Sequence, residues 1–186
     1  MKVSREQATR NREAVVDAAS RLFRAQGVDG AGIAEIMAET GLTHGGFYKQ
    51  FGSKNALAAE ACAKSLERSA RHWRAIADEA QGDPRAAIAK DYLSIRNRDR
   101  PERGCALIAL AGDAARKGEG LADAYRAGVE GLLAVLEQAG DDREGALARL
   151  SQLVGAMALA RAVKDDAFSQ EIMAAAQKAL AIDEGA

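Results

Sequence analysis

The sequence predicts an all-α protein of about nine helices, and three observations lead to that fold class. Hydrophobic residues make up 48% of the 186 residues but aromatic residues only 4%, so the core must consist mainly of Ala, Leu, Val and Ile. Proline, the residue least compatible with a helix, occurs only twice. Apolar residues recur at helical spacing between short turn segments, and no segment shows a convincing strand pattern.

Three short-to-medium helices are expected in the N-terminal part. Residues 9–26 carry the apolar stripe of an amphipathic helix. A short helix follows at 33–39, and another at about 43–50, whose first residue is a good N-cap. Gly41 lies in the turn between these two short helices, where glycine accepts a positive φ. Two short helices joined by a glycine-containing turn form a helix-turn-helix, the generic motif for reading DNA.

The remaining helices are separated by glycine, serine and proline signals. Ser53 is a natural N-cap for a long helix, and Asp83 followed by Pro84 marks another helix start. The six further helices are expected at about 54–80, from 84 to the charged run at 96–101, and at 105–116, 121–139, 143–164 and 167–181.

The second short helix has a surface that is unusual for a purely structural helix. Gly45 and Gly46 each cost helix propensity, about 1 kcal/mol relative to alanine. That cost is easier to explain when the backbone must approach phosphates or base edges closely. Tyr48 supplies a hydroxyl and Lys49 an ammonium group on the exposed side. The next helix begins at Lys54, and free amide groups beside a lysine form a good phosphate site.

The pattern Gly-x-Phe-Tyr-x-x-Phe-x-Ser-Lys at 45–54 is highly specific. With its flanks, from Phe23 to Leu57, it resembles the DNA-binding domain of the TetR family of transcriptional regulators. Two positions depart from the family pattern: Gly32, where many relatives carry threonine or serine, and Gln50, where many carry histidine. The resemblance implies that the residues facing DNA are Thr43, His44, Gly45, Tyr48 and Lys49, with Lys54 binding a backbone phosphate.

The resemblance also implies the overall organisation and function. Residues 1–54 are expected to form the helix-turn-helix DNA-binding domain, and 55–186 a helical domain for effector binding and dimerisation. The expected function is sequence-specific regulation of transcription, most commonly repression that ends when a small-molecule or reactive effector binds. TetR-like proteins dimerise through their last two helices, which implies a homodimer on double-stranded DNA with a palindromic operator.

The last two predicted helices are rich in apolar and small residues, as a dimer interface would be. The candidate interface residues are Leu150, Val154, Met157, Ile172 and Met173. Packing inside a single chain is the alternative interpretation of the same pattern.

Three residues of the middle region are candidates to line an apolar effector pocket: Trp73, Cys105 and Tyr125. Ordinary core packing is the alternative for each. Cys105 follows an arginine-rich segment and stands near the start of a helix, and both features favour a reactive thiolate. Cys105 is therefore either a sensor of electrophiles or oxidants or a buried, inert cysteine.

Charge supports DNA binding only weakly. Residues 1–54 contain eight Lys/Arg and six Asp/Glu, whereas the remainder contains 18 and 21. The net charge therefore has the expected sign in the N-terminal part, where Arg5, Arg10 and Arg12 are further candidates to reach the DNA backbone. A solvated helix face explains those arginines equally well.

Other functional classes find little support in the sequence. The two histidines and two cysteines lack the close pairs of a zinc site, and we find no phosphate-binding loop or nucleophile elbow. No secretory signal or membrane span is evident. We therefore expect a cytoplasmic protein without cofactor, metal or catalytic residues. The alternatives are a small helical enzyme with Cys105 as nucleophile and a helical interaction module that does not bind DNA.

Overall fold

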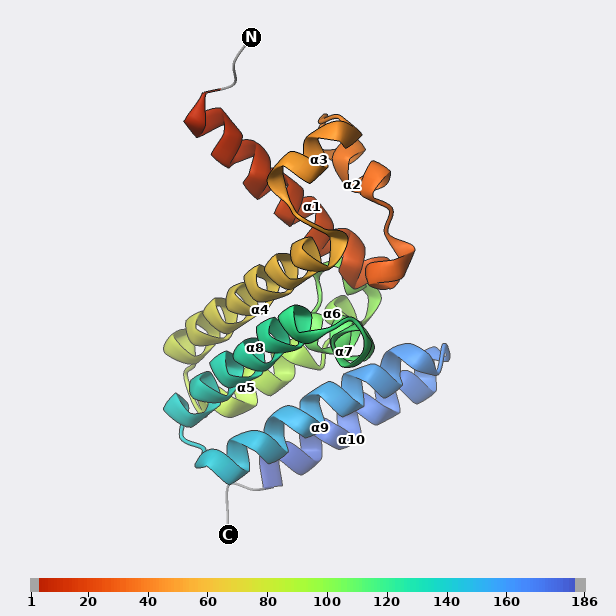
Figure 1. Ribbon diagram of the computed structural model, residues 1–186. Coiled ribbons are helices and arrows are strands. Elements are labelled where there is room, and N and C mark those ends of the chain that lie inside the picture. The colour runs from red at the N-terminus through yellow and green to blue at the C-terminus, as the bar shows by residue number, and fades with distance from the viewer. Residues whose placement is uncertain (1–3, 183–186) are drawn as a thin grey trace. The chain divides into compact units, whose positions relative to one another are not determined.

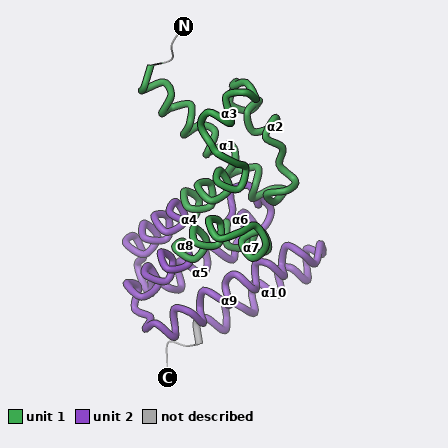
Figure 2. The backbone as a smooth tube through the Cα atoms, viewed as in Figure 1, with its two compact units in different colours: residues 1–66, 105–128 green, residues 67–104, 129–186 purple. Residues whose placement is uncertain are grey.

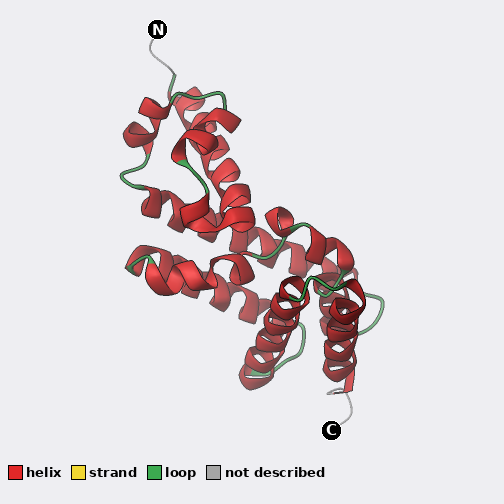
Figure 3. Cartoon of the chain, turned by 90° about the vertical axis from the view of Figure 1, so that its right-hand side faces the viewer, coloured by secondary structure: helices red, strands yellow, loops and turns green. Residues whose placement is uncertain are grey.

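The computed structural model describes residues 4–182, and all regular structure among them is helical (Figure 1, Figure 3). The predicted fold class is therefore confirmed, while the outermost ends of the predicted domains, 1–3 and 183–186, lie outside the described residues. The elements are α1 (Arg5–Gly30), α2 (Ile33–Glu39), α3 (His44–Gln50), α4 (Lys54–Glu79), α5 (Pro84–Tyr92), α6 (Ile95–Asp99), the 3-10 turn η1 (Pro101–Arg103), α7 (Ala106–Arg116), α8 (Glu119–Gln138), α9 (Arg143–Ala162) and α10 (Asp166–Ile182).

The described residues form ten α-helices, one more than the sequence predicted. The additional helix arises where a single helix was expected from residue 84 onward. Leu93 leaves helical geometry with φ −87° and ψ 53°, and the Ser94 hydroxyl then caps α6 by accepting the Asn97 N–H at 3.3 Å. Ser94 explains the difference. Its hydroxyl accepts the Asn97 N–H, which would donate to a backbone carbonyl if the helix continued.

The chain divides into two compact units (Figure 2). One contains the chain up to Leu66 together with Cys105–Gly128, and the other contains Glu67–Gly104 and the chain from Val129 onward. Helices α4 and α8 each begin in the first unit and end in the second. The boundary predicted at residue 54 separates a DNA-binding domain from an effector-binding and dimerisation domain. That division stays a prediction.

Helix α1 is bent near its end, and α7 supports the bend. Gly27 has φ +76°, a left-handed conformation that glycine adopts without a steric penalty. The next residue, Val28, is buried and donates its N–H to Asp113 Oδ2 of α7 at 2.8 Å. Because Asp113 is itself only 7% exposed, this hydrogen bond satisfies two polar groups that water does not reach.

Further polar contacts surround this bend. Lys117, just after α7, forms an ion pair with Asp29, and this contact holds the pKa of the Asp29 carboxyl below its usual range. The Lys117 carbonyl accepts a hydrogen bond from Asn55 Nδ2 at 3.2 Å. The end of α1, the end of α7 and the start of α4 are thereby linked to one another.

In the second unit, α9 and α10 pack side by side (Figure 1, Figure 3). Arg149 of α9 is buried, and its Nε donates to Asp141 Oδ2 at 2.7 Å. The same guanidinium donates to the Leu180 carbonyl of α10 at 3.3 Å. Both side chains of the ion pair are at most 5% exposed. This pair connects the turn before α9 with α10, since one arginine serves both.

Replacing Asp113 tests the link between α1 and α7. Asp113→Ala removes the side-chain acceptor of the buried Val28 N–H, so we expect a loss of about 1–3 kcal/mol in the free energy of unfolding. Asp113→Asn retains an acceptor oxygen and should lose less. Urea denaturation monitored by circular dichroism measures both variants. Equal stability of the alanine variant and the original protein would show that the bond does not support the bend.

Candidate nucleic-acid interface

Helices α2 and α3 pack together as a helix-turn-helix. The turn contains Gly41 at φ +68°, as the sequence analysis expected. The Leu42 N–H donates to the Met37 carbonyl at 3.0 Å, which closes the end of α2. Ile36 and Met37 are buried beneath the turn. The motif is therefore a compact pair of helices with its apolar residues turned inward.

Two aromatic rings hold α3 in place. Phe47 and Phe51 are at most 2% exposed, and their rings stack with centroids 5.6 Å apart at an interplanar angle of 28°. The prediction that both rings face inward is confirmed. Thr43 occupies the N-cap position, but its hydroxyl makes no capping hydrogen bond.

The opposite face of α3 is open. The residues predicted to face DNA at this helix are all exposed: Thr43, His44, Gly45, Tyr48 and Lys49. Tyr48 is the most prominent, with 62% of its surface exposed, and its ring stands edge-on to the buried Phe47 at 5.0 Å. The structure thus brings these five residues together on one element, with the tyrosine hydroxyl and the lysine ammonium available for contact.

The glycines of α3 are not required by the chain's own packing. A Cβ added at Gly45 would have no atom within 4 Å among the described residues. A Cβ at Gly46 would meet only Met37 Cε and Thr43 Oγ1, both at an ordinary 3.8 Å. Glycine at these positions therefore has no explanation inside the protein, which is consistent with close approach of another molecule.

Lys54 stands at the start of α4, beside the helix-turn-helix. The Ser53 hydroxyl accepts the Ala56 N–H at 3.0 Å, so the predicted N-cap is confirmed. Lys54 is half-buried, and its Nζ lies 3.4 Å from the Asp29 carbonyl oxygen. This long contact orients the ammonium group at the helix start.

Arg12 has a role that the sequence analysis missed. Its guanidinium donates two hydrogen bonds of 2.6 Å to Glu60 of α4, and these bonds raise the pKa of Arg12. The same group lies 4.6 Å from the centroid of the Phe51 ring. Arg12 therefore joins α1 to α4 and covers the end of α3. Its partner is 48 residues away, so no local pattern reveals the contact.

The three predicted effector residues lie in two different units. Trp73, in the second unit, is 2% exposed and packs edge-on against Tyr92 with ring centroids 5.5 Å apart. Cys105 and Tyr125 belong to the first unit, where Cys105 is 5% exposed. The Tyr125 hydroxyl donates to the Leu107 carbonyl of α7 at 2.8 Å.

The apolar surroundings of Tyr125 disfavour the charged form of its hydroxyl. Burial raises its pKa to about 12, and the nearby Cys105 and Cys62 act in the same direction. Burial likewise raises the pKa of the Cys62 thiol to about 12. Tyr125 and the two cysteines thus share one buried region of the first unit, in which neutral forms are favoured.

The residues predicted to form the dimer interface differ in how deeply they are buried within the chain. Leu150, Met157 and Met173 are buried within the chain, whereas Val154 and Ile172 are half-buried. The large apolar side chains that α9 and α10 expose are instead Leu147 at 44%, Leu159 at 58% and Phe168 at 51%. The dimer interface stays a prediction.

No helix in the described part of the chain is long and apolar enough to cross a membrane. Among the same residues, no three His, Cys, Asp or Glu side chains gather where they could hold a metal ion.

Sequence comparisons match the helix-turn-helix region. The sequence profile described as bacterial regulatory proteins of the tetR family matches residues 15–61. A curated protein of Bacillus subtilis (strain 168), the uncharacterized HTH-type transcriptional regulator YerO, is 30% identical over 88 residues. The matched segment is 47% of this chain and 30% of that relative, so the chain spans about a third of the relative's length.

Structural comparisons extend over nearly the whole chain. A TetR transcriptional regulator from Chloroflexus aurantiacus J-10-FL is similar with a TM-score of 0.78 and 25% identity, covering 95% of each chain. The reduced form of Escherichia coli NemR is similar with a TM-score of 0.77 and 20% identity, covering 92% of this chain and 95% of that one. The arrangement of the helices is therefore that of solved TetR-type structures.

A pair of glycine substitutions tests whether α3 needs its glycine for folding. Gly45→Ala should stabilise the protein by about 0.5–1 kcal/mol, because alanine favours a helix and meets no neighbour there. Gly41→Ala, in equally open space but at φ +68°, should cost about 1–2 kcal/mol. Thermal unfolding measures both. A destabilising Gly45→Ala substitution would assign this glycine to the fold instead.

Proposed function

We propose that this chain belongs to the TetR family of bacterial regulatory proteins and that it represses transcription by binding a DNA operator in the cytoplasm. The observation that carries the proposal is the exposed face of α3, where Tyr48 and Lys49 stand above buried aromatic rings. A helix that is rigidly supported on one side and polar on the other suits entry into the major groove.

Each residue of that face has a distinct part in the proposed contact. Lys49 pairs with a phosphate, and the Tyr48 hydroxyl donates to a phosphate or base edge. Gly45 lets the backbone approach the DNA, since no side chain intervenes. Thr43 and His44 contact the DNA at the start of α3. Lys54, together with the free amide groups at the start of α4, takes a further backbone phosphate.

The proposed regulator acts as a homodimer. The large apolar side chains of Leu147, Leu159 and Phe168 on α9 and α10 are exposed among the described residues, and burial against a second copy would remove them from water. A second copy offers the same surface, so a two-fold axis lets each chain cover the other. Val154 and Ile172 extend this surface, and Leu150, Met157 and Met173 support it from the core. Two recognition helices related in this way read the two halves of a palindrome.

Release from DNA is proposed to begin in the first unit. An effector bound beside Cys105 and Tyr125 would act on α7, because Tyr125 hydrogen-bonds the Leu107 carbonyl. Asp113 of the same helix holds Val28 of α1, which belongs to the DNA-binding segment. A coupling of about 1–3 kcal/mol between effector and DNA is sufficient for release. Cys105 is the group on which a reactive effector would act.

Gel-shift titrations with DNA from upstream of the protein's own gene test DNA binding. Lys49→Ala should weaken binding about tenfold and reduce the slope of log K against log salt by about one per protomer, because one phosphate contact is lost. Gly45→Ala should also weaken binding, although it stabilises the fold. Lys178→Ala is the matched control, since Lys178 is an exposed lysine of α10 far along the chain from the motif. It should leave binding unchanged.

The same titration separates the other functional classes. A folded chain that shows no salt-sensitive, sequence-preferring binding at low salt would refute the regulator proposal. In that case the exposed face of α3 would belong to a helical module that binds another protein. Loss of a chemical activity on Cys105→Ser, with DNA binding absent, would instead point to an enzyme.

Substitutions on the exposed apolar face test the dimer. Phe168→Asp and Leu159→Asp should shift the protein from dimer to monomer in sedimentation equilibrium, because each places a charge in a surface that must lose water. Ile95→Asp is the control, because Ile95 is 49% exposed but lies on α6. Dimers that persist in both test variants, or an original protein that is monomeric at micromolar concentration, would contradict the proposed interface.

A further inference from the structure

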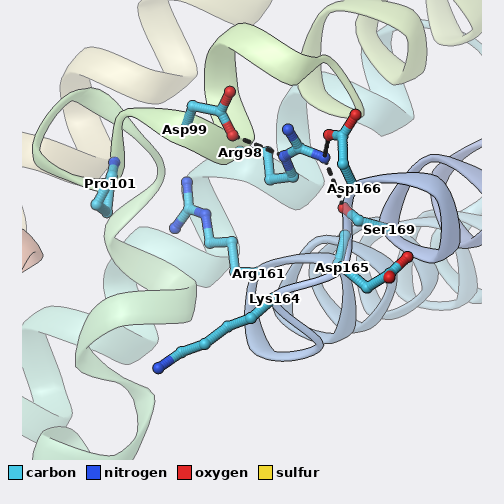
Figure 4. Close-up of a pocket in the computed structure, with 9 residues that line it drawn as sticks. Arg98, Asp99, Pro101, Arg161, Lys164, Asp165, Asp166 and Ser169 are labelled. Atoms are coloured by element: carbon cyan, nitrogen blue, oxygen red, sulfur yellow. Dashed lines mark hydrogen bonds and ion pairs between the residues drawn. The ribbon is translucent and has the colours of Figure 1, made fainter.

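The second unit contains a pocket at the turn between α9 and α10 (Figure 4). Its volume is about 430 Å³, which is within the range of small-molecule sites. One wall comes from the end of α6 and the 3-10 turn η1, and the other from the end of α9 and the start of α10. The side chains that matter most for its chemistry are three cations and three carboxylates.

One side of the pocket is a closed network of paired charges. Arg98 donates to Asp99 at 2.7 Å and to Asp166 at 2.7 Å, and it also donates to the Ser169 hydroxyl at 3.0 Å. These two carboxylates raise the pKa of Arg98. Asp165 accepts the Phe168 N–H at 2.7 Å and so caps the start of α10. These groups hold the turn together, and one guanidinium stands with three carboxylates, so this side of the pocket is negative.

The other side of the pocket holds the remaining two cations. Arg161 and Lys164 are three residues apart at the end of α9, and Figure 4 shows Arg161 pointing toward Pro101 while Lys164 extends away from the Arg98 network. Lys164 forms no ion pair or side-chain hydrogen bond with any residue in the described part of the chain. Its backbone has φ +51°, the one positive φ of a described residue other than glycine. Lys164 therefore presents an ammonium group with no described partner at the pocket.

Arg161 is held in position by backbone atoms. Its Nη2 donates to the Asn97 carbonyl at 2.6 Å. The guanidinium lies against Gly104, where an added Cβ would overlap Nη2. Gly104 therefore makes room for the arginine, and the planar group is fixed at the pocket before any ligand arrives. A fixed guanidinium is well suited to bind a carboxylate because little side-chain freedom is lost.

We propose that this pocket binds a small organic carboxylate, with its anionic group between Arg161 and Lys164 and its apolar body against Pro101 and Ala160. A ligand with a single negative charge is favoured over a phosphate, because Asp99, Asp165 and Asp166 also line the pocket and would repel a second charge. The site is separate from the region of Cys105 and Tyr125 and does not depend on the proposed DNA binding.

Nuclear magnetic resonance titration of the full chain, labelled with nitrogen-15, tests this site with benzoate as probe. Benzoate should cause saturable shifts of amides in 98–104 and 160–169. Benzamide and benzylamine have the same ring but no negative charge, and they should not saturate at the same concentrations. Acetate and hexanoate serve as further carboxylates with smaller and longer apolar bodies. The titration contains no DNA, so its failure and the failure of the proposed function are distinguishable.

Two variants identify the charges responsible. Lys164→Gln should weaken benzoate binding about tenfold, the loss expected for one charge-assisted hydrogen bond, and it should not change thermal stability. Lys178→Gln, also an exposed lysine of this unit, should bind benzoate like the original protein. Arg161→Lys keeps the charge and should retain part of the affinity.

Three results would overturn the proposal. Equal binding of benzamide and benzoate would show that the negative charge is irrelevant, and it refutes a carboxylate site. Unchanged benzoate affinity in Lys164→Gln would show that the Lys164 ammonium group does not bind the carboxylate, and the proposed site would fail. Failure of all three carboxylates to bind with a Kd below about 10 mM leaves the pocket without the proposed ligand class.

Discussion

The seven residues of α3 are too few to persist as a helix in isolation, where about 12–15 residues are needed. Phe47 and Phe51 overcome this limit, because their stacked rings are buried against the rest of the first unit. Arg12 adds a cation over the Phe51 ring and binds Glu60, so α3 is held from α1 and α4 together. The position of the exposed residues of α3 depends on the packing of these buried rings.

Few aromatic side chains are available elsewhere, and buried polar contacts set much of the geometry. Asp113 holds the bend of α1, and the Arg149–Asp141 pair joins the turn before α9 to α10. Removal of either partner leaves a buried group unsatisfied, which makes these contacts intolerant of change.

The two proposed ligand regions differ in chemistry. The surroundings of Tyr125 and the cysteines raise the pKa of Tyr125 and of Cys62, so an uncharged molecule suits that region. The pocket at the α9–α10 turn instead offers Arg161 and Lys164 in a charged setting. A regulator with both would respond to two unrelated classes of compound through separate units.

The sequence by itself determined the all-α class, the helix-turn-helix and the outward position of Tyr48 and Lys49. These properties follow from local signals: glycine in a turn, a serine cap, and two phenylalanines spaced one helical turn apart. Tertiary structure alone decided that Leu150, Met157 and Met173 are buried within one chain and that Leu159 and Phe168 are exposed. It also decided the partner of Arg12 and the pocket of Arg161 and Lys164. These features join residues far apart in the chain, and helical periodicity says which residues share a face but not what that face meets.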